Sequence, residues 1–235
     1  MHIHIMPGVD DGAKNKYASL QMGEIAEDCG TNIMVVTPHA NMPDIYMNTY
    51  DQVYKEKYLA LKESFREHRL QIQLLQGMEI FVTDDIVQKL QRHELITLNH
   101  TKTPLIEFDF QESFDYMVDM SQELLLHGYR PLLAHPERYR TFVHDPLRLL
   151  QLKQMGVMIQ VNKSSVLGHF GRSIKRTADY FLSHGWVDVA ASDAHGANSR
   201  TPNLSDLYYY LDTEYGCAEL LLEINPRRIL SNNID

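Results

Sequence analysis

A recurring pattern of helix-like stretch, glycine and short apolar run organises most of this chain. Four segments share it: EIAEDCGTNIMVVTPH, ELLLHGYRPLLAHPER, LLQLKQMGVMIQVNKS and YFLSHGWVDVAASDAH. Their glycines, Gly30, Gly128, Gly156 and Gly185, are each expected just after a helix C-terminus, where a positive φ is favoured. The apolar runs that follow are four to eight residues long and rich in Val, Ile and Leu. Because they are apolar on both faces, they predict buried parallel strands.

Two further strands and five amphipathic helices complete the pattern. The strands are predicted at 71–80 and 103–108, and the helices at 14–29, 51–69, 112–127, 144–155 and 172–184. This alternation indicates parallel βαβ units, which at 235 residues form either a closed barrel or a doubly wound sheet. The sequence contains no linker and no strict repeat. Residues 1–235 are therefore expected to form a single domain.

Composition and charge narrow the class of protein. Hydrophobic residues make up 44% and charged residues 23% of the chain, as in ordinary globular proteins. No apolar run approaches the ~18 residues that cross a bilayer, and a signal-peptide pattern is absent, so we expect a cytoplasmic protein without membrane insertion. Two cysteines, Cys29 and Cys217, are too few for a disulfide scaffold. A formal net charge of −9 argues against nucleic acid as a partner.

Ionisable side chains fall where the predicted strands end. These are His39, Glu79, Glu107, His135, Asp193 and His195, joined by His2, His4 and Asp11 from the opening HIHIMPGVDDG. Because the carboxyl ends of parallel strands meet at one face, residues far apart in the sequence are expected to converge there. Any one of them alone is better explained as a hydrogen-bonded loop residue. Together, the nine predict a metal centre.

The mixture of ligand types restricts the metal and its chemistry. Structural zinc sites take four ligands, usually with thiolates, and neither cysteine lies near these strand ends. Five imidazoles and four carboxylates suit Mn²⁺, Fe²⁺, Zn²⁺ or Mg²⁺, arranged as two or three ions with bridging carboxylates. Multinuclear centres of this kind generally carry out hydrolysis.

Two arginines and one insert lie beside the expected centre. Arg138 follows His135 in AHPERY, and Arg200 follows His195 in DAHGANSRTP. Guanidinium groups bind phosphate oxygens bidentately, which favours a phosphoester substrate, although a salt bridge with a carboxylate is the alternative for each. The insert at 41–51, NMPDIYMNTYD, is interpreted either as a lid over the pocket or as a plain loop.

The ordered segments HIHIMPGVDDG, TPH, GMEI, LIEF, AHPERY, QVNKSS and SDAH cover essentially the whole chain. In that order they resemble the PHP family (polymerase and histidinol phosphatase), and more narrowly its bacterial tyrosine-protein phosphatases from capsule and exopolysaccharide loci. The resemblance implies a distorted TIM-like (β/α)7 barrel and a manganese-dependent centre, with Mg, Fe, Co or Zn as alternatives. It implies the same nine residues as metal ligands, and Arg138 and Arg200 as the phosphate-binding catalytic residues.

The resemblance also implies the reaction and the partner. A metal-activated hydroxide would hydrolyse phosphotyrosine in a protein substrate, the tyrosine-rich tail of a bacterial tyrosine kinase. One departure is that only Met1 precedes His2, whereas family members usually carry a few residues there, so the first strand is either abbreviated or clipped. Whether the protein forms a homo-oligomer is left open.

Three other functions are weighed against this one. Cysteine-dependent tyrosine phosphatases need an arginine six positions after the nucleophile, but Val35 and Glu223 occupy those positions here. A histidinol-phosphate phosphatase would share the ligand set and differ in substrate. A catalytically idle, metal-stabilised module that binds the kinase is the alternative from another class, and it would not need open metal positions.

Overall fold

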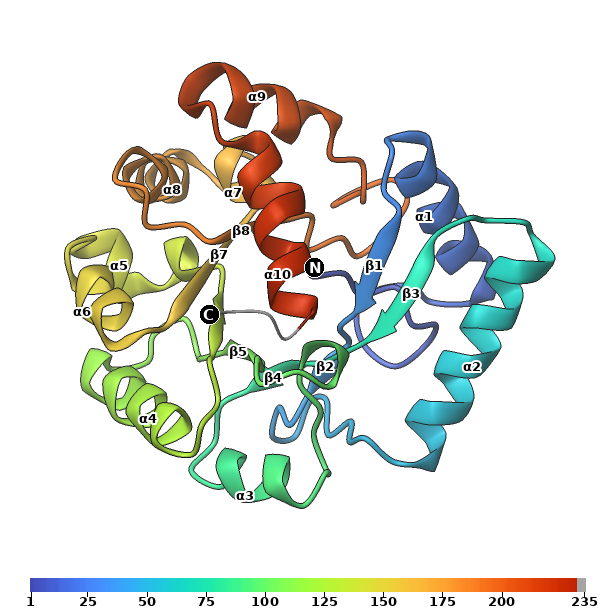
Figure 1. The fold of residues 1–235 in the computed structure, drawn as a ribbon, viewed down its shortest axis with the longest axis horizontal. Coiled ribbons are helices and arrows are strands. Elements are labelled where there is room, and N and C mark those ends of the chain that lie inside the picture. Colours follow the sequence, from blue (N-terminus) through green and yellow to red (C-terminus); the bar gives the residue numbers. More distant parts are fainter. Residues whose placement is uncertain (232–235) are drawn as a thin grey trace.

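Parallel strands surround the centre of the molecule in the computed structural model, which describes residues 1–231 (Figure 1). Six of them form one sheet, in the order β2 (His39–Ala40), β4 (Glu79–Phe81), β5 (Leu105–Glu107), β6 (Leu132–Ala134), β7 (Met158–Asn162) and β8 (Val189–Ala191). β1 (Ile33–Val36) and β3 (Gln73–Gln76) pair with each other in a second sheet. All of these pairs are parallel, as the apolar runs predict.

The opening segment, residues 1–5, closes the ring. Ile3 forms a parallel bridge with Ala194, just beyond β8. On its other side, the Ile3 carbonyl accepts a hydrogen bond of 3.1 Å from the backbone N–H of Thr37, just beyond β1. Since β1 leads into β2 and β3 into β4, the ring has seven strand positions. The prediction of a distorted (β/α)7 barrel is confirmed, and closure excludes a doubly wound sheet.

The distortion comes from breaks in two strands. Pro38 separates β1 from β2, and it has no N–H to give to a neighbouring strand. Gly77 separates β3 from β4, and a Cβ there would lie 2.8 Å from Val35 Cγ1. The sequence predicted one continuous strand at 71–80, which is wrong at this break. His39 and Glu79 begin the strand segments that follow the breaks and pair in register with each other.

Helices cover the outside of the ring (Figure 1). Five match the predicted ones: α1 (Lys16–Asp28), α2 (Gln52–Glu67), α4 (Phe114–Leu126), α6 (Arg148–Met155) and α8 (Arg172–Ser183). The prediction at 144–155 starts too early because the turn at Asp145 and Pro146 separates α6 from α5. The glycines predicted after helices have positive φ, from 67° at Gly185 to 103° at Gly156.

The remaining helices are mostly short. They are α3 (Ile86–Gln91), α5 (Arg140–His144), α7 (Lys163–Val166), α9 (Ser205–Tyr215) and α10 (Asn225–Leu230), with 3-10 turns η1 (Leu98–His100) and η2 (Pro136–Arg138) and the π-helical turn η3 (Leu220–Ile224). Four of the five helices have six residues or fewer, too few for an apolar periodicity to be recognised. No helix in the described range is long and apolar enough to cross a membrane.

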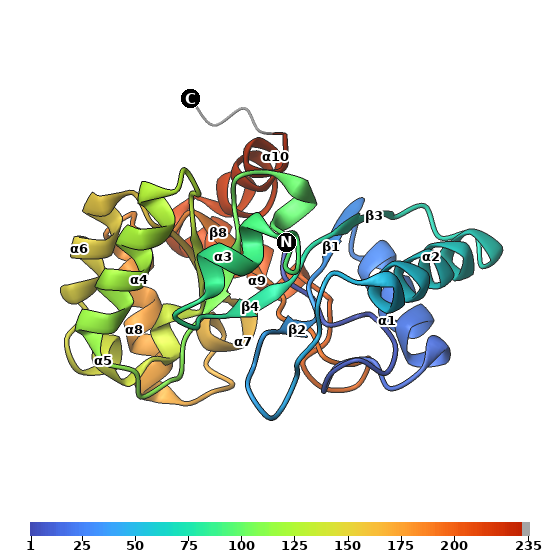
Figure 2. The ribbon, with the colours of Figure 1, turned by 90° about the horizontal axis from the view of Figure 1, so that it is seen from below.

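Helix α10 closes one end of the barrel. Ile229 is 3% exposed and packs in an apolar cluster with Leu98 of η1 and with residues from the barrel wall: Val35, Leu105, Leu132, Ala134 and Val189. Figure 2 shows α10 at one end of the molecule and the loop after β2 at the other. Because α10 fills one mouth with apolar side chains, the polar chemistry is restricted to the opposite mouth.

Truncating this apolar plug should destabilise the whole barrel. We expect Ile229→Ala to lower the free energy of unfolding by about 2–5 kcal/mol, because it leaves a cavity among buried side chains. Leu126→Ala is the matched control, since Leu126 is 72% exposed and its truncation should change stability by less than about 0.5 kcal/mol. Urea unfolding followed by circular dichroism measures both, and equal effects would contradict the role given to α10.

Candidate metal centre

The nine predicted metal ligands meet at the open mouth of the barrel. The opening segment contributes His2 and His4, and the loop after it contributes Asp11. His39 and Glu79 begin β2 and β4, and the remaining four, Glu107, His135, Asp193 and His195, lie at or just beyond the ends of β5, β6 and β8. Their donor atoms form four overlapping groups, each within 4.8 Å: His4, Asp11, His39 and His195; His2, His4 and Asp193; His2, Glu79 and His135; His39, Glu79 and Glu107. The groups share members, as expected where neighbouring ions share ligands.

Glu79 lies at the centre of this cluster. Its Oε2 is 3.2 Å from the Nε2 atoms of both His2 and His4, and 3.0 Å from Nδ1 of His39. Its other oxygen, Oε1, is 2.9 Å from Nε2 of His135. The two oxygens therefore face different histidines, which is the arrangement of a carboxylate that bridges two ions.

The donor set fits bound cations. Nδ1 of His39, Nδ1 of His135, Oε2 of Glu79 and Oε2 of Glu107 are buried and make no hydrogen bond with any of residues 1–231. Buried polar atoms without partners are costly, so these atoms need a ligand. His2 and His4 also bring two Nε2 atoms within 3.1 Å, and two neutral imidazoles can satisfy both atoms only through a shared proton or cation.

The electrostatics of the cluster support the same conclusion. Burial lowers the pKa of His135 to about 4, which keeps its imidazole neutral and able to ligate. Burial and the nearby carboxylate of Glu79 raise the pKa of Glu107 well above its ordinary value. Burial opposes the charge on Glu79, but His2 and His39 outweigh it and hold the pKa of Glu79 well below its usual range. The carboxylates thus compete for a limited positive charge, which divalent ions would supply.

Polar side chains that the sequence analysis did not single out orient the two leading histidines. Asp10 Oδ2 lies 2.8 Å from Nδ1 of His4 and accepts a hydrogen bond of 3.0 Å from the backbone N–H of His39. Gln160 Oε1 lies 2.9 Å from Nδ1 of His2. Both contacts leave the Nε2 atoms facing Glu79 and Asp193. Partners of this kind fix the tautomer and the orientation of a ligating histidine.

A chain of amides continues from Gln160 to Asp193. Gln160 donates to Asn162 Oδ1 at 2.7 Å, and Asn162 Nδ2 donates to Asp193 Oδ2 at 2.5 Å. The motif QVNKSS includes Gln160 and Asn162. Their amide side chains were not recognised in the sequence because only His, Asp and Glu were considered as metal donors. Lys163 in the same motif donates to the carbonyls of Thr201 and Asn203, anchoring the loop that carries Arg200.

Both predicted arginines lie beside the cluster. Arg200 Nη2 is 2.6 Å from Asp193 Oδ2, and Arg138 Nη1 is 3.8 Å from the same atom. Nε of Arg200 is buried and makes no hydrogen bond within the described chain. His135, Asp193 and Arg200 all have positive φ, between 37° and 46°, which is unusual for residues with a side chain. Backbone strain of this kind concentrates at functional sites.

Gly12 allows the opening segment to approach the loop that follows it. A Cβ at this position would lie 2.1 Å from the carbonyl oxygen of His4 and 2.4 Å from its Cβ. That carbonyl accepts a hydrogen bond of 3.0 Å from the backbone N–H of Ala13. Only glycine therefore permits the turn that brings Asp10 and Asp11 back to the histidines.

The other seven histidines are exposed, as predicted: His68, His93, His100, His127, His144, His169 and His184. The insert after His39 places Tyr46 in a parallel stack on the His39 ring, with centroids 5.5 Å apart. Within this insert, Met42 and Tyr46 form an isolated antiparallel β-bridge, so the segment is a structured loop beside the cluster. Its interpretation as a lid over the pocket or as a plain loop stays a prediction.

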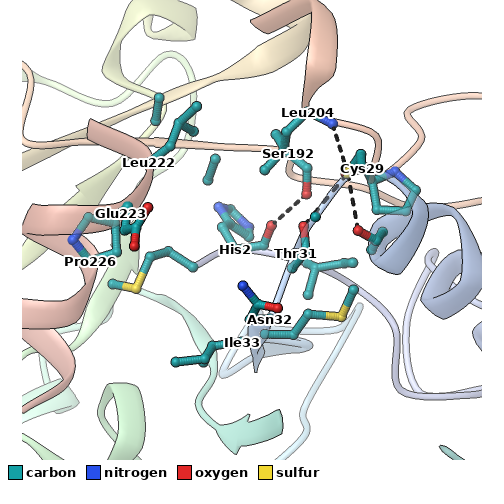
Figure 3. Close-up of a pocket in the computed structure, with 18 of the residues that line it drawn as sticks. His2, Cys29, Thr31, Asn32, Ile33, Ser192, Leu204, Leu222, Glu223 and Pro226 are labelled. Carbon is teal, nitrogen blue, oxygen red and sulfur yellow. Dashed lines mark hydrogen bonds between the residues drawn. The ribbon is translucent and has the colours of Figure 1, made fainter. Parts of the chain in front are cut away.

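A cavity of about 480 Å³ lies apart from most of the donor cluster, between β1 and the C-terminal helices (Figure 3). Its lining includes Cys29, Thr31, Leu204 and Leu222, and of the nine candidate ligands it includes His2 alone. Cys29 Sγ accepts a hydrogen bond from the backbone N–H of Leu204 at 3.5 Å, which ties α1 to the loop before α9. Charged side chains, Glu219, Glu223 and Arg227, border the cavity as well as apolar ones, but the candidate metal donors other than His2 lie outside it.

Removing the partner of His4 should weaken metal binding. We expect Asp10→Asn to lower the affinity for Mn²⁺ by about 10- to 100-fold, because the amide no longer fixes Nε2 of His4 toward the cluster. Asp119→Asn, at an exposed position of α4, is the control. Calorimetric titration of metal-stripped protein gives the affinities, and an unchanged value for Asp10→Asn would contradict the orienting role.

Comparison with known proteins places the chain in a family. The model of the capsular polysaccharide synthesis family CpsB/CapC matches residues 1–231. The chain is 32% identical to the tyrosine-protein phosphatase YwqE of Bacillus subtilis (strain 168), covering 99% of this chain and 91% of YwqE. It is 30% identical to the tyrosine-protein phosphatase CpsB of Streptococcus pneumoniae, covering 100% and 98% of the two chains.

A solved structure agrees in fold. It comes from crystal structures of YwqE from Bacillus subtilis and CpsB from Streptococcus pneumoniae, described as unique metal-dependent tyrosine phosphatases. It matches with a TM-score of 0.92 and 31% identity, covering 98% of this chain and 93% of that one. The resemblance drawn from the ordered motifs is confirmed, and the chain belongs to the CpsB/CapC family of capsular polysaccharide synthesis proteins.

Proposed function

We propose that this chain is a manganese-dependent tyrosine-protein phosphatase, acting as a single domain. The observation that carries the proposal is the convergence of nine metal donors, all buried or half-buried except Asp11, with two arginines at one mouth of the barrel. The names of YwqE and CpsB as tyrosine-protein phosphatases support it. The nine residues that would hold the ions are His2, His4, Asp11, His39, Glu79, Glu107, His135, Asp193 and His195.

Divalent ions in this cluster would lower the pKa of a bound water and stabilise charge on phosphoryl oxygens. Manganese is proposed among them because the family resemblance implies it, and the donor set of imidazoles and carboxylates without a thiolate suits this ion as it suits Fe²⁺ and Zn²⁺. Arg138 and Arg200 would bind the outer oxygens of the phosphoryl group, each being only partly exposed at the rim. Asp193 holds Arg200 in place, so the guanidinium is oriented before substrate arrives.

The leaving group suits the residues present. A tyrosyl phenolate has a pKa near 10, so it departs more easily than an alkoxide and requires less help from a general acid. The side chains around the cluster are mostly histidines and carboxylates that we assign to metal binding. A site with little spare acid is therefore better matched to a phenol ester than to a serine ester.

The proposed substrate is phosphotyrosine in a protein, the tail of a bacterial tyrosine kinase. A protein substrate needs a surface beside the site, and the insert after His39 offers one. Ile45 and Met47 are 65% and 58% exposed there, on either side of Tyr46. Exposed apolar side chains next to a catalytic mouth favour contact with a polypeptide.

Metal dependence and substrate preference test this function together. We expect metal-stripped protein to release no phosphate from a phosphotyrosyl peptide, and added Mn²⁺ to restore turnover. Histidinol phosphate, assayed in parallel, should be a poorer substrate. Preference for histidinol phosphate would keep the metal centre and overturn the proposed substrate, while no turnover of either would favour an idle kinase-binding module.

Truncating an arginine tests the phosphate-binding role. We expect Arg200→Ala to lower kcat/KM for the peptide by about 10²- to 10³-fold, as for loss of one charge-stabilising donor. Arg92→Ala is the control, because Arg92 is 71% exposed and remote in sequence from the cluster. Metal content is measured in each variant. A loss of activity that tracks a loss of metal would contradict a direct role for Arg200.

A further inference from the structure

Two phenylalanines enclose Arg138. Its guanidinium carbon lies 4.4 Å from the ring centroid of Phe110 and 4.9 Å from that of Phe170. The ring centroid of Phe170 also lies 5.8 Å from the guanidinium carbon of Arg200. All three distances are within the ~6 Å at which a cation is attracted to an aromatic face. We call Phe110 and Phe170 the aromatic clamp.

The backbone fixes both residues of the aromatic clamp. The carbonyl of Phe110 accepts a hydrogen bond of 2.9 Å from the backbone N–H of Arg140. Phe170 lies in the turn between α7 and α8. In this turn the backbone N–H of His169 donates to the carbonyl of Ser164 at 2.8 Å, and that of Gly171 donates to the carbonyl of Gly168 at 3.1 Å. The rings are thus positioned by the fold and are not free side chains on long loops.

The aromatic clamp is open toward the mouth. Phe110 is 37% exposed, and its ring lies 5.9 Å from that of the candidate ligand His135. Phe170 is half-buried. A phosphoryl group held by Arg138 and Arg200 would direct its ester substituent away from the cluster, past the rings that pack on these arginines. An aromatic substituent would meet aromatic faces there, and an alkyl chain would gain less.

We propose that Phe110 and Phe170 form a subsite for the ring of an aryl phosphate, so that the site prefers aryl over alkyl phosphate esters. This inference rests on the proposed function, because it assigns the ring of phosphotyrosine a binding place. The aromatic clamp has two roles, positioning Arg138 and contacting the ring. Only the second distinguishes aryl from alkyl ligands, since Arg138 acts on the phosphoryl group of both.

Tyr46 is the competing residue. It stacks on His39 at the end of β2, whereas Phe110 and Phe170 follow β5 and β7. Two strands, β4 and β5, lie between β2 and β6 in the sheet, and Arg138 lies in the turn that follows β6. Tyr46 therefore borders another part of the mouth, and its substitution distinguishes the two places.

Binding of non-hydrolysable ligands tests the subsite without turnover. Phenylphosphonate and propylphosphonate are titrated calorimetrically into the manganese-loaded protein. We expect the unmodified chain to prefer phenylphosphonate, and Phe170→Leu and Phe110→Leu each to reduce that preference by about fivefold. Phe170→Tyr should keep it, because the aromatic face is retained.

The control variant is Phe114→Leu. The guanidinium carbon of Arg148 lies 5.3 Å from the ring centroid of Phe114, but this pair is not part of the cluster of nine donors. It should leave the preference unchanged. Equal affinity of the unmodified chain for the two phosphonates, unaltered preference in both leucine variants, or loss of preference in Tyr46→Leu instead would each overturn the subsite. Aryl preference without hydrolysis of the phosphotyrosyl peptide would retain the subsite and reject the proposed function.

Discussion

Burial of the Glu79 carboxylate among four histidines is the interaction on which the rest of the structure depends. It lies within 3.2 Å of nitrogens from His2, His4, His39 and His135, and its side chain is 1% exposed. A buried carboxylate needs compensating charge, yet Glu107 and Asp193 approach the same space and compete for it. Cations resolve this competition, so the cluster has a physical reason to bind metal that is independent of any resemblance.

The barrel is distorted where this cluster requires it. Pro38 and Gly77 break two neighbouring strands at the same level, and His39 and Glu79 follow the breaks as a paired register. Gly12 lets the loop carrying Asp10 and Asp11 fold back against His4. Pro38, Gly77 and Gly12 therefore shape the site by placing the candidate ligands that follow or precede them.

The sequence predicted the architecture and grouped six of the nine candidate donors because both follow from the apolar runs, while His2, His4 and Asp11 were added from the opening HIHIMPGVDDG. Helix, glycine and apolar run repeat along the chain, and the ionisable residues stand directly after the runs. It did not reveal Asp10, Gln160 or Asn162, because their importance depends on which ring nitrogen they face. Short helices such as α3 and α7 were not predicted because their order comes from tertiary packing and not from periodicity.

The two arginines and the candidate metal donors meet at one carboxylate, that of Asp193. Asp193 offers Oδ1 to His2 and His4, while Oδ2 receives Arg200 and the amide of Asn162. A shift in Asp193 would therefore disturb metal ligation and phosphate binding together. Its left-handed backbone, like that of His135 and Arg200, stores strain that the surrounding hydrogen bonds must hold. The opening segment contributes directly to this support at Asp193, whose backbone N–H donates to the carbonyl of His2, and at the neighbouring Ala194, which bridges Ile3.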